Sequence, residues 1–206
     1  MTDIIIPSCK AYHELRMLVN VIKSTDSDEF NYIPTGYNAS ASVNRNAGLI
    51  RADNDIVIMI DDDIGGFYDG WQKDLIAPLL EENSQIAITS ARLITPEGVN
   101  SPMLGSKYAI GLDYEIAEPA VLSAAIAFNQ KLLAGIYFDP LYEGSGYEDT
   151  DFCFQVKRAF PEKRFAIINK CRLIHYHEMK NQSPYASQNK ALFLSKWGQA
   201  ALDSIS

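Results

Sequence analysis

Residues 56–60 of this 206-residue chain read IVIMI, an apolar run that leads directly into Asp61, Asp62 and Asp63 and then, after Ile64, into two glycines. A short, continuous apolar run is typical of a parallel strand that is covered on both faces. Three adjacent carboxylates repel one another, and their protons are hard to remove unless a cation lies nearby. The segment therefore predicts a buried strand that ends at a cation site.

Other segments alternate between strand-like and helix-like apolar patterns. The predicted strands are residues 3–7, 30–36, 86–94 and 120–128. The predicted helices are residues 12–21, 38–52 and 71–80. In the second helix, Val43, Ala47 and Ile50 recur at helical spacing, and Pro78 is expected to interrupt the third. Alternating strands and helices indicate a layered α/β fold with a mainly parallel sheet. In such sheets ligands bind beyond the carboxyl ends of the strands, which is where the aspartates lie.

Composition limits the class of protein. A hydrophobic content of 47% and a charged content of 21%, with no repeat or linker-like stretch, predict one globular domain over residues 1–206. No apolar stretch is long enough for a membrane span, and the N-terminus lacks a signal-peptide pattern, so a cytoplasmic protein is expected. The three cysteines have no metal-type spacing and are expected to be reduced thiols.

The net charge of −8 argues against general nucleic-acid binding, which needs a basic face. One local exception is the basic cluster between residues 157 and 172, which contains six Lys and Arg residues and a single acidic residue, Glu162. We expect these residues to be a solvated helix end and strand edge, and the alternative is a docking patch for an anionic acceptor.

The aspartate triplet can be placed by the alternation of side chains along an extended chain. This alternation would point Asp61 and Asp63 the same way, with Asp62 opposite. Paired carboxylates suit Mg2+ or Mn2+, whose remaining ligands are usually water and phosphate oxygens, so a nucleoside diphosphate is the natural partner. Gly65 and Gly66 would let a substrate approach the backbone. The alternative is that the aspartates form only a turn.

A second acidic cluster, Glu148, Asp149 and Asp151, follows a glycine-bearing loop and opens a predicted helix. Acids in a first helical turn stabilise the helix dipole whatever their chemistry. An ionised carboxylate that faces a cavity can also take a proton from an attacking hydroxyl, so Asp149 or Glu148 is a candidate general base. The residues alone leave both interpretations open.

Two histidines, His175 and His177, end a further apolar run and flank one tyrosine. In an extended segment they would share a face, and either could reach a metal, since Mn2+ accepts imidazole. Lys180 lies near enough in sequence to neutralise a phosphate.

Taken in order, the segments "IIIPSCK", "SVNRNAGLIRADNDIVIMIDDD", "IYFDPLYEGSGYEDTDFCFQV" and "LIHYHEMKNQS" resemble the GT-A glycosyltransferases, particularly the family-2-like group. The resemblance spans almost the whole chain. It implies the GT-A fold, a single-domain Rossmann-like α/β/α sandwich, and a Mn2+- or Mg2+-dependent enzyme that moves a sugar from a nucleoside-diphosphate sugar to an acceptor hydroxyl. The acceptor class stays open.

The resemblance also implies roles for individual residues. Asp61 and Asp63 would bind metal and donor, with Asp62 near the ribose, and His175 fits the metal-linked histidine better than His177. Pro7, Ser8, Arg45 and Lys180 would contact the donor. Asp149 would be the base of a single inverting displacement, assisted by Glu148, with Gly146, Asp151 and His177 supporting the acceptor side.

Two other classes of protein remain possible. A Mg2+-dependent phosphohydrolase also places aspartates at a strand end, although its nucleophile usually lies on the first strand, which here ends without an acid in "PSCK". A sugar-nucleotide or carbohydrate-binding module would bind the same ligand without turnover.

Overall fold

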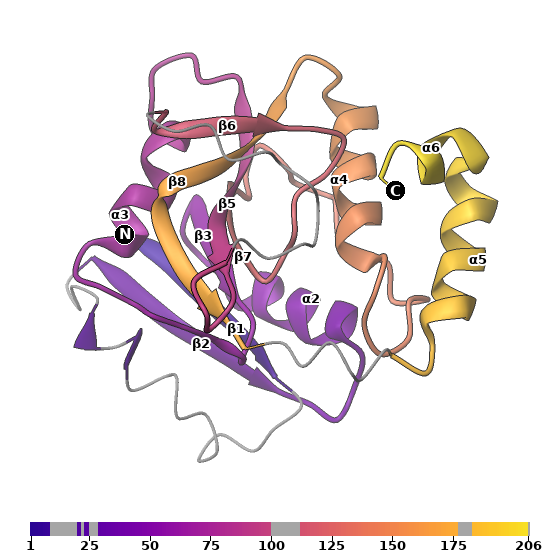
Figure 1. Cartoon of the computed structure of the whole chain (residues 1–206), viewed down its shortest axis with the longest axis horizontal. Coiled ribbons are helices and arrows are strands. Elements are labelled where there is room, and N and C mark those ends of the chain that lie inside the picture. Colours follow the sequence, from indigo (N-terminus) through magenta and orange to yellow (C-terminus); the bar gives the residue numbers. More distant parts are fainter. Residues whose placement is uncertain (9–19, 22, 25–28, 100–111, 177–182, 206) are drawn as a thin grey trace.

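The computed structural model describes residues 1–8, 20–21, 23–24, 29–99, 112–176 and 183–205. Strands and helices alternate through most of the chain, as the apolar patterns predict (Figure 1). The elements are β1 (Thr2–Ser8), β2 (Phe30–Gly36), α2 (Ala41–Arg51), β3 (Ile56–Ile60), β4 (Ile64–Gly65), α3 (Trp71–Ile76), the 3-10 helix η2 (Ala77–Leu79), β5 (Ile86–Ile94), β6 (Tyr114–Ala117), β7 (Ala125–Asn129), α4 (Glu148–Ala159), β8 (Arg164–His175), α5 (Ala186–Trp197) and α6 (Gln199–Asp203).

The strands form one sheet in the order β2-β1-β3-β7-β5-β8-β4, and β6 pairs with β8 outside this path. β1 pairs in parallel with both β2 and β3, and β5 pairs in parallel with β8. β7 lies antiparallel between β3 and β5, so β3 and β5 share one direction. Most strands therefore run the same way, which confirms the expected mainly parallel sheet.

Helices cover both faces of the sheet (Figure 1). On one face, Trp71 and Leu75 of α3 pack in a core with β-strand residues such as Ile58. On the other face, Leu49 of α2 and Phe152 of α4 pack with the remaining strand side chains. The result is a three-layer α/β/α arrangement, in which α5 and α6 add a further layer beside α4 (Figure 1).

Most predicted elements are present. All five residues of β3 are buried, as expected for a strand covered on both faces. Pro78 separates α3 from η2, because its ring cannot continue an α-helix. The predicted strand 120–128 is shorter than expected, and β7 begins only at Ala125. The preceding residues leave the sheet and line a cavity. The predicted helix 12–21 lies largely outside the described residues.

The apolar stripe of α2 was predicted wrongly. Val43 and Ile50 are exposed, to 39% and 76%, whereas Arg45, Gly48 and Leu49 are buried. Gly48 packs so closely on β1 that an added Cβ would lie 2.3 Å from Cγ2 of Ile5. The buried face of α2 is therefore chosen by close packing at Gly48 and by the ion pairs of Arg45, which outweigh the simple apolar pattern.

The basic cluster between residues 157 and 172 serves largely as structural support. Lys157 and Arg164 both pair with Glu118, and Lys170 pairs with Asp113. These pairs favour the solvated helix end and strand edge over a docking patch. Cys153 and Cys171 are buried free thiols, as expected. In the described part of the chain, no helix combines the length and apolarity that a membrane crossing requires.

Candidate active site

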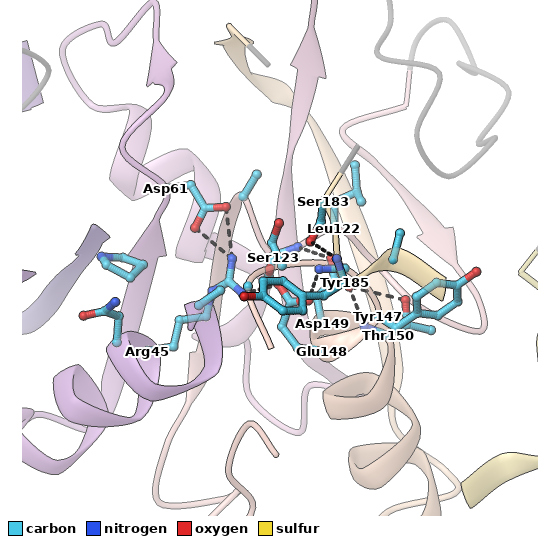
Figure 2. Close-up of a pocket in the computed structure, with 18 of the residues that line it drawn as sticks. Arg45, Asp61, Leu122, Ser123, Tyr147, Glu148, Asp149, Thr150, Ser183 and Tyr185 are labelled. Atoms are coloured by element: carbon cyan, nitrogen blue, oxygen red, sulfur yellow. Dashed lines mark hydrogen bonds and ion pairs between the residues drawn. The ribbon is translucent and has the colours of Figure 1, made fainter. Parts of the chain in front are cut away.

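A cavity of about 880 Å3 opens at the carboxyl ends of β1, β3 and β8, opposite the start of α4. Its lining includes all three aspartates of the triplet and the base candidate Asp149. Figure 2 shows Asp61 and Asp149 among the residues that line it. The other predicted site residues that line it are Pro7, Ser8, Arg45, Gly146, Glu148 and His175. Residues from distant parts of the sequence thus meet at the edge of the sheet where α/β proteins bind ligands.

The aspartate triplet forms a turn rather than an extended segment. The backbone N–H of Ile64 donates to the carbonyl of Asp61 at 3.3 Å, so side chains do not alternate between two faces here. The expectation that Asp62 points away from its neighbours is therefore wrong, since all three residues line the cavity. Asp62 accepts a hydrogen bond of 2.5 Å from the hydroxyl of Ser8 at the end of β1.

The two glycines after the triplet pack closely against neighbouring side chains, and neither is among the residues that line the cavity. A Cβ at Gly65 would lie 2.7 Å from the ring of Tyr176, and one at Gly66 would lie 2.9 Å from the side chain of Ile174. Gly66 also has a positive φ of 75°. The glycines let β4 lie flat against β8, which holds the turn in place.

This packing brings Asp63 and His175 together. Ile64 of β4 is paired with His175 of β8, and the N–H of Tyr176 donates to the carbonyl of Asp63 at 2.9 Å. The Oδ2 of Asp63 lies 3.4 Å from the Nε2 of His175, which is almost fully buried. A carboxylate beside an imidazole is a donor set that suits Mn2+.

Among the described residues, no three or more His, Cys, Asp or Glu side chains are arranged so that they could hold a metal ion by themselves. The pair of Asp63 and His175 therefore fits a cation that takes its other ligands from solvent and phosphate, as Mg2+ and Mn2+ commonly do. His177 and Lys180 lie outside the described residues.

Arg45 joins the two acidic clusters. Its Nη2 donates to both carboxylate oxygens of Asp61, at 2.9 and 3.0 Å, and its Nη1 donates to Oε1 of Glu148 at 2.7 Å (Figure 2). Burial alone would lower the pKa of Arg45, but the charges of Asp61, Glu148 and Asp149 outweigh burial and raise that pKa. Burial raises the pKa of Asp61, and Arg45 opposes that rise. Arg45 thus stays positively charged and connects Asp61 to Glu148.

The start of α4 presents Glu148 and Asp149 in different ways. Glu148 is buried, and its second oxygen, Oε2, accepts from the N–H of Gly146 at 2.5 Å. Tyr147, which lies between Gly146 and Glu148 in the sequence, has a positive φ of 71°, and the φ of Gly146 is also positive, at 109°. A left-handed tyrosine is uncommon and costs free energy, so the surrounding contacts must impose it.

Asp149 is half-buried beside the cavity. Its Oδ1 accepts from the N–H of Thr150 at 2.7 Å, and its Oδ2 accepts from the N–H of Ser123 at 3.3 Å. Burial and the neighbouring charge of Glu148 raise its pKa to about 6, while Arg45 and the two N–H groups oppose the rise. A carboxylate with this pKa is ionised at neutral pH and remains basic enough to accept a proton.

Asp151 lies behind the cavity rather than in its lining. It is fully buried and accepts hydrogen bonds from Tyr142, Gln155 and Trp197, and it pairs with Lys196. Trp197 and Lys196 belong to α5, so Asp151 ties that helix to α4.

Asn189, which the sequence did not single out, holds the loop before α4. Its Nδ2 donates to the carbonyls of Glu143 and Gly146, and its Oδ1 accepts from the N–H of Glu143. It is fully buried on α5. A single asparagine in a helical pattern gives no signal of this kind, because its partners lie in a loop far away in the sequence.

No family model matches the chain, and no curated protein matches it in sequence. Solved structures do match. GalNAc-T7, crystallised with UDP, GalNAc and Mn2+, superposes with a TM-score of 0.68 at 14% identity, over 98% of this chain and 48% of that one. The chain thus spans about half of GalNAc-T7.

Two further matches cover more of the other protein. Glucosyl-3-phosphoglycerate synthase from Mycobacterium tuberculosis, in complex with phosphoglyceric acid, has a TM-score of 0.61 at 17% identity, over 96% of this chain and 80% of that one. A197 from STIV has a TM-score of 0.59 at 15% identity, over 86% of each chain. The protein therefore has the fold of the GT-A glycosyltransferases.

Proposed function

We propose that the protein is a metal-dependent glycosyltransferase that moves a sugar from a nucleoside-diphosphate sugar to an acceptor hydroxyl. One observation carries the proposal: a single cavity holds the aspartate triplet after β3 and the carboxylate of Asp149 at the start of α4. The triplet suits a cation-bound diphosphate, and Asp149 suits a general base. The GT-A fold, and the UDP and Mn2+ in the structure of GalNAc-T7, support this assignment.

In the proposed reaction the donor lies across the triplet. Ser8 and Asp62, linked to each other at the end of β1, would contact the nucleoside, next to Pro7. Asp63 and His175 would hold Mn2+ or Mg2+, and Lys180 would add positive charge near the phosphates. When bound, the cation would neutralise the charge of the departing diphosphate.

Asp149 would act at the other end of the reaction. An acceptor hydroxyl loses its proton to the Asp149 carboxylate while its oxygen forms a bond to the anomeric carbon of the sugar. The bond from that carbon to the diphosphate breaks, and the nucleoside diphosphate leaves with the electron pair. A single displacement of this kind inverts the configuration at the anomeric carbon. Positioning and charge neutralisation supply most of the catalysis.

The test is a screen of nucleotide sugars with Mn2+ or Mg2+, with thermal unfolding as the first readout, since a ligand that binds the native state raises its apparent stability. Nucleoside diphosphate release is then measured with and without candidate acceptors, and we expect release that depends on an acceptor.

Two outcomes would contradict the proposal. Phosphate release from simple phosphate esters without an acceptor would favour a phosphohydrolase. Donor binding with no turnover for any acceptor class would favour a binding module.

A further inference from the structure

We propose that Arg45 is a positioning residue that couples the donor end of the cavity to the base: one guanidinium, held between Asp61 and Glu148, sets the place and the charge environment of Asp149. This inference rests on the proposed transferase function. It assigns to Arg45 a role different from direct contact with the nucleotide.

The geometry leaves Arg45 little freedom. The residue is 3% exposed, and both of its terminal nitrogens are engaged, one by Asp61 and the other by Glu148. The guanidinium also lies 5.3 Å above the centre of the Phe138 ring. Arg45 thereby links α2, the end of β3 and the start of α4. A planar fork can satisfy two carboxylates at once, whereas the single ammonium of a lysine cannot reproduce this geometry.

Glu148 transmits this restraint to the loop that carries the base. One of its oxygens binds Arg45, and the other accepts from the N–H of Gly146. Tyr147 lies between Gly146 and Glu148 in the sequence and has a left-handed backbone conformation. This conformation costs free energy and persists only where contacts with neighbouring residues, such as those of Glu148, impose it. Glu148 is buried and ion-paired with Arg45, so it holds the loop, whereas Asp149 is half-buried in the cavity lining and is the carboxylate that can accept a proton from the acceptor.

Arg45 and Glu148 have opposite effects on the pKa of Asp149. The groups around Asp149 include the carboxylate of Glu148, the guanidinium of Arg45, the N–H groups of Thr150 and Ser123, the hydroxyl of Thr150 and the buried thiol of Cys153. Glu148 raises the pKa of Asp149, and Arg45 lowers it. Removing the charge of one residue must therefore move the proton affinity of Asp149 in the direction opposite to removing the other.

The experiment compares Arg45→Gln, Arg45→Lys and Glu148→Gln by the pH dependence of kcat/KM with a nucleotide sugar and acceptor. We expect the acidic limb to move up by about one pH unit in Arg45→Gln and down by about one unit in Glu148→Gln. Arg45→Lys keeps the positive charge but loses the planar guanidinium that binds two carboxylates at once. The acidic limb of its pH profile should therefore stay near that of the wild type, while kcat falls at least about tenfold.

The proposal would be overturned if the limbs of Arg45→Gln and Glu148→Gln both stayed in place or moved the same way, even if both variants had reduced activity. If Arg45→Gln does not fold, the other two variants still test the proposal. The acidic limb should move down in Glu148→Gln and stay in place in Arg45→Lys.

A second readout separates this inference from the proposed function. The Asp149 carboxylate can be titrated directly by NMR of carbon-labelled, metal-free protein, with Asp149→Asn to assign its signal. If the wild type transfers no sugar but the titration shifts are opposite, the coupling stands and the proposed function fails. If transfer is observed without opposite shifts, the coupling is wrong and the transferase assignment stands.

Discussion

The indole Nε1 of Trp197 donates to the Oδ1 of Asp151 at 2.7 Å and so fastens α5 to the first turn of α4, next to Asp149. The same carboxylate accepts from Tyr142 and Gln155 and pairs with Lys196. The wall of the cavity that comes from the C-terminal region, which includes Leu202 and Ile205, is therefore held through a residue that does not itself reach the cavity.

The substitution Asp151→Asn should destabilise the protein by about 2–3 kcal/mol, because hydrogen bonds to a buried charged group are among the stronger ones. Tyr142→Phe is the matched control. It removes one donor to the same carboxylate without changing shape, and it should cost about 1 kcal/mol. Chemical denaturation of the three proteins measures both values. Equal stability of Asp151→Asn and the wild type would show that this carboxylate does not hold α5.

Asp149→Asn should lose sugar transfer by at least about a hundredfold, since an amide cannot accept the proton of the hydroxyl. Donor affinity should change little, because the proposed donor site is at the aspartate triplet. Calorimetry with the nucleoside diphosphate and a transfer assay separate the two effects. An Asn variant that keeps full activity would exclude Asp149 as the base.

Activity of the wild type should depend on pH through the same residue. A base works only when it is deprotonated, so kcat/KM should rise as the pH increases through about 6, the raised pKa of Asp149, and level off above it. A profile of initial rates from pH 4.5 to 8 would show this limb at about 6. A profile that is flat over this range would contradict the assignment.

Donor binding should require a divalent cation, because a diphosphate beside Asp61, Asp62 and Asp63 is otherwise repelled. A chelator should weaken binding of UDP or the matching diphosphate at least about tenfold, and Asp63→Asn or His175→Ala should have a similar effect. Asp74→Asn is a control, since Asp74 lies on α3, outside the cavity, and accepts a hydrogen bond from the hydroxyl of Tyr68. Equal affinity with and without chelator would exclude a metal-bridged donor.

Gly48→Ala should destabilise the protein by about 1–3 kcal/mol, because the added methyl group would overlap Ile5 of the central sheet. Ile50→Ala, on the same helix, removes a larger apolar group but should cost at most about 0.5 kcal/mol, since Ile50 is exposed. Thermal or chemical unfolding compares the two variants. The reverse order would mean that α2 is rotated relative to this description.

The sequence was most informative where one local rule dominated. The continuous apolar run of β3 predicted a strand buried on both faces, and Pro78 predicted the break after α3. The placement of Asp149 at the start of a helix was also confirmed, because acidic residues followed by a helical apolar pattern mark such a start.

Sequence reasoning failed where contacts between distant segments decide the outcome. The buried side of α2 is set by Ile5 and by the partners of Arg45, none of which is visible in the spacing of Val43 and Ile50. The triplet was expected to be extended, but it forms a turn in which the N–H of Ile64 donates to the carbonyl of Asp61, and the carbonyl of Asp63 accepts from the N–H of Tyr176 after β8.

Asp63 immediately precedes β4 and His175 ends β8, and the backbones of these two segments are hydrogen-bonded to each other, which keeps the two residues adjacent. Their proximity is set when the protein folds, and a cation bound at the proposed site would meet a ready-made pair with little conformational entropy left to lose. Substitutions that loosen the contact of Gly65 and Gly66 with β8 should consequently weaken ion affinity while leaving both ligand side chains chemically intact.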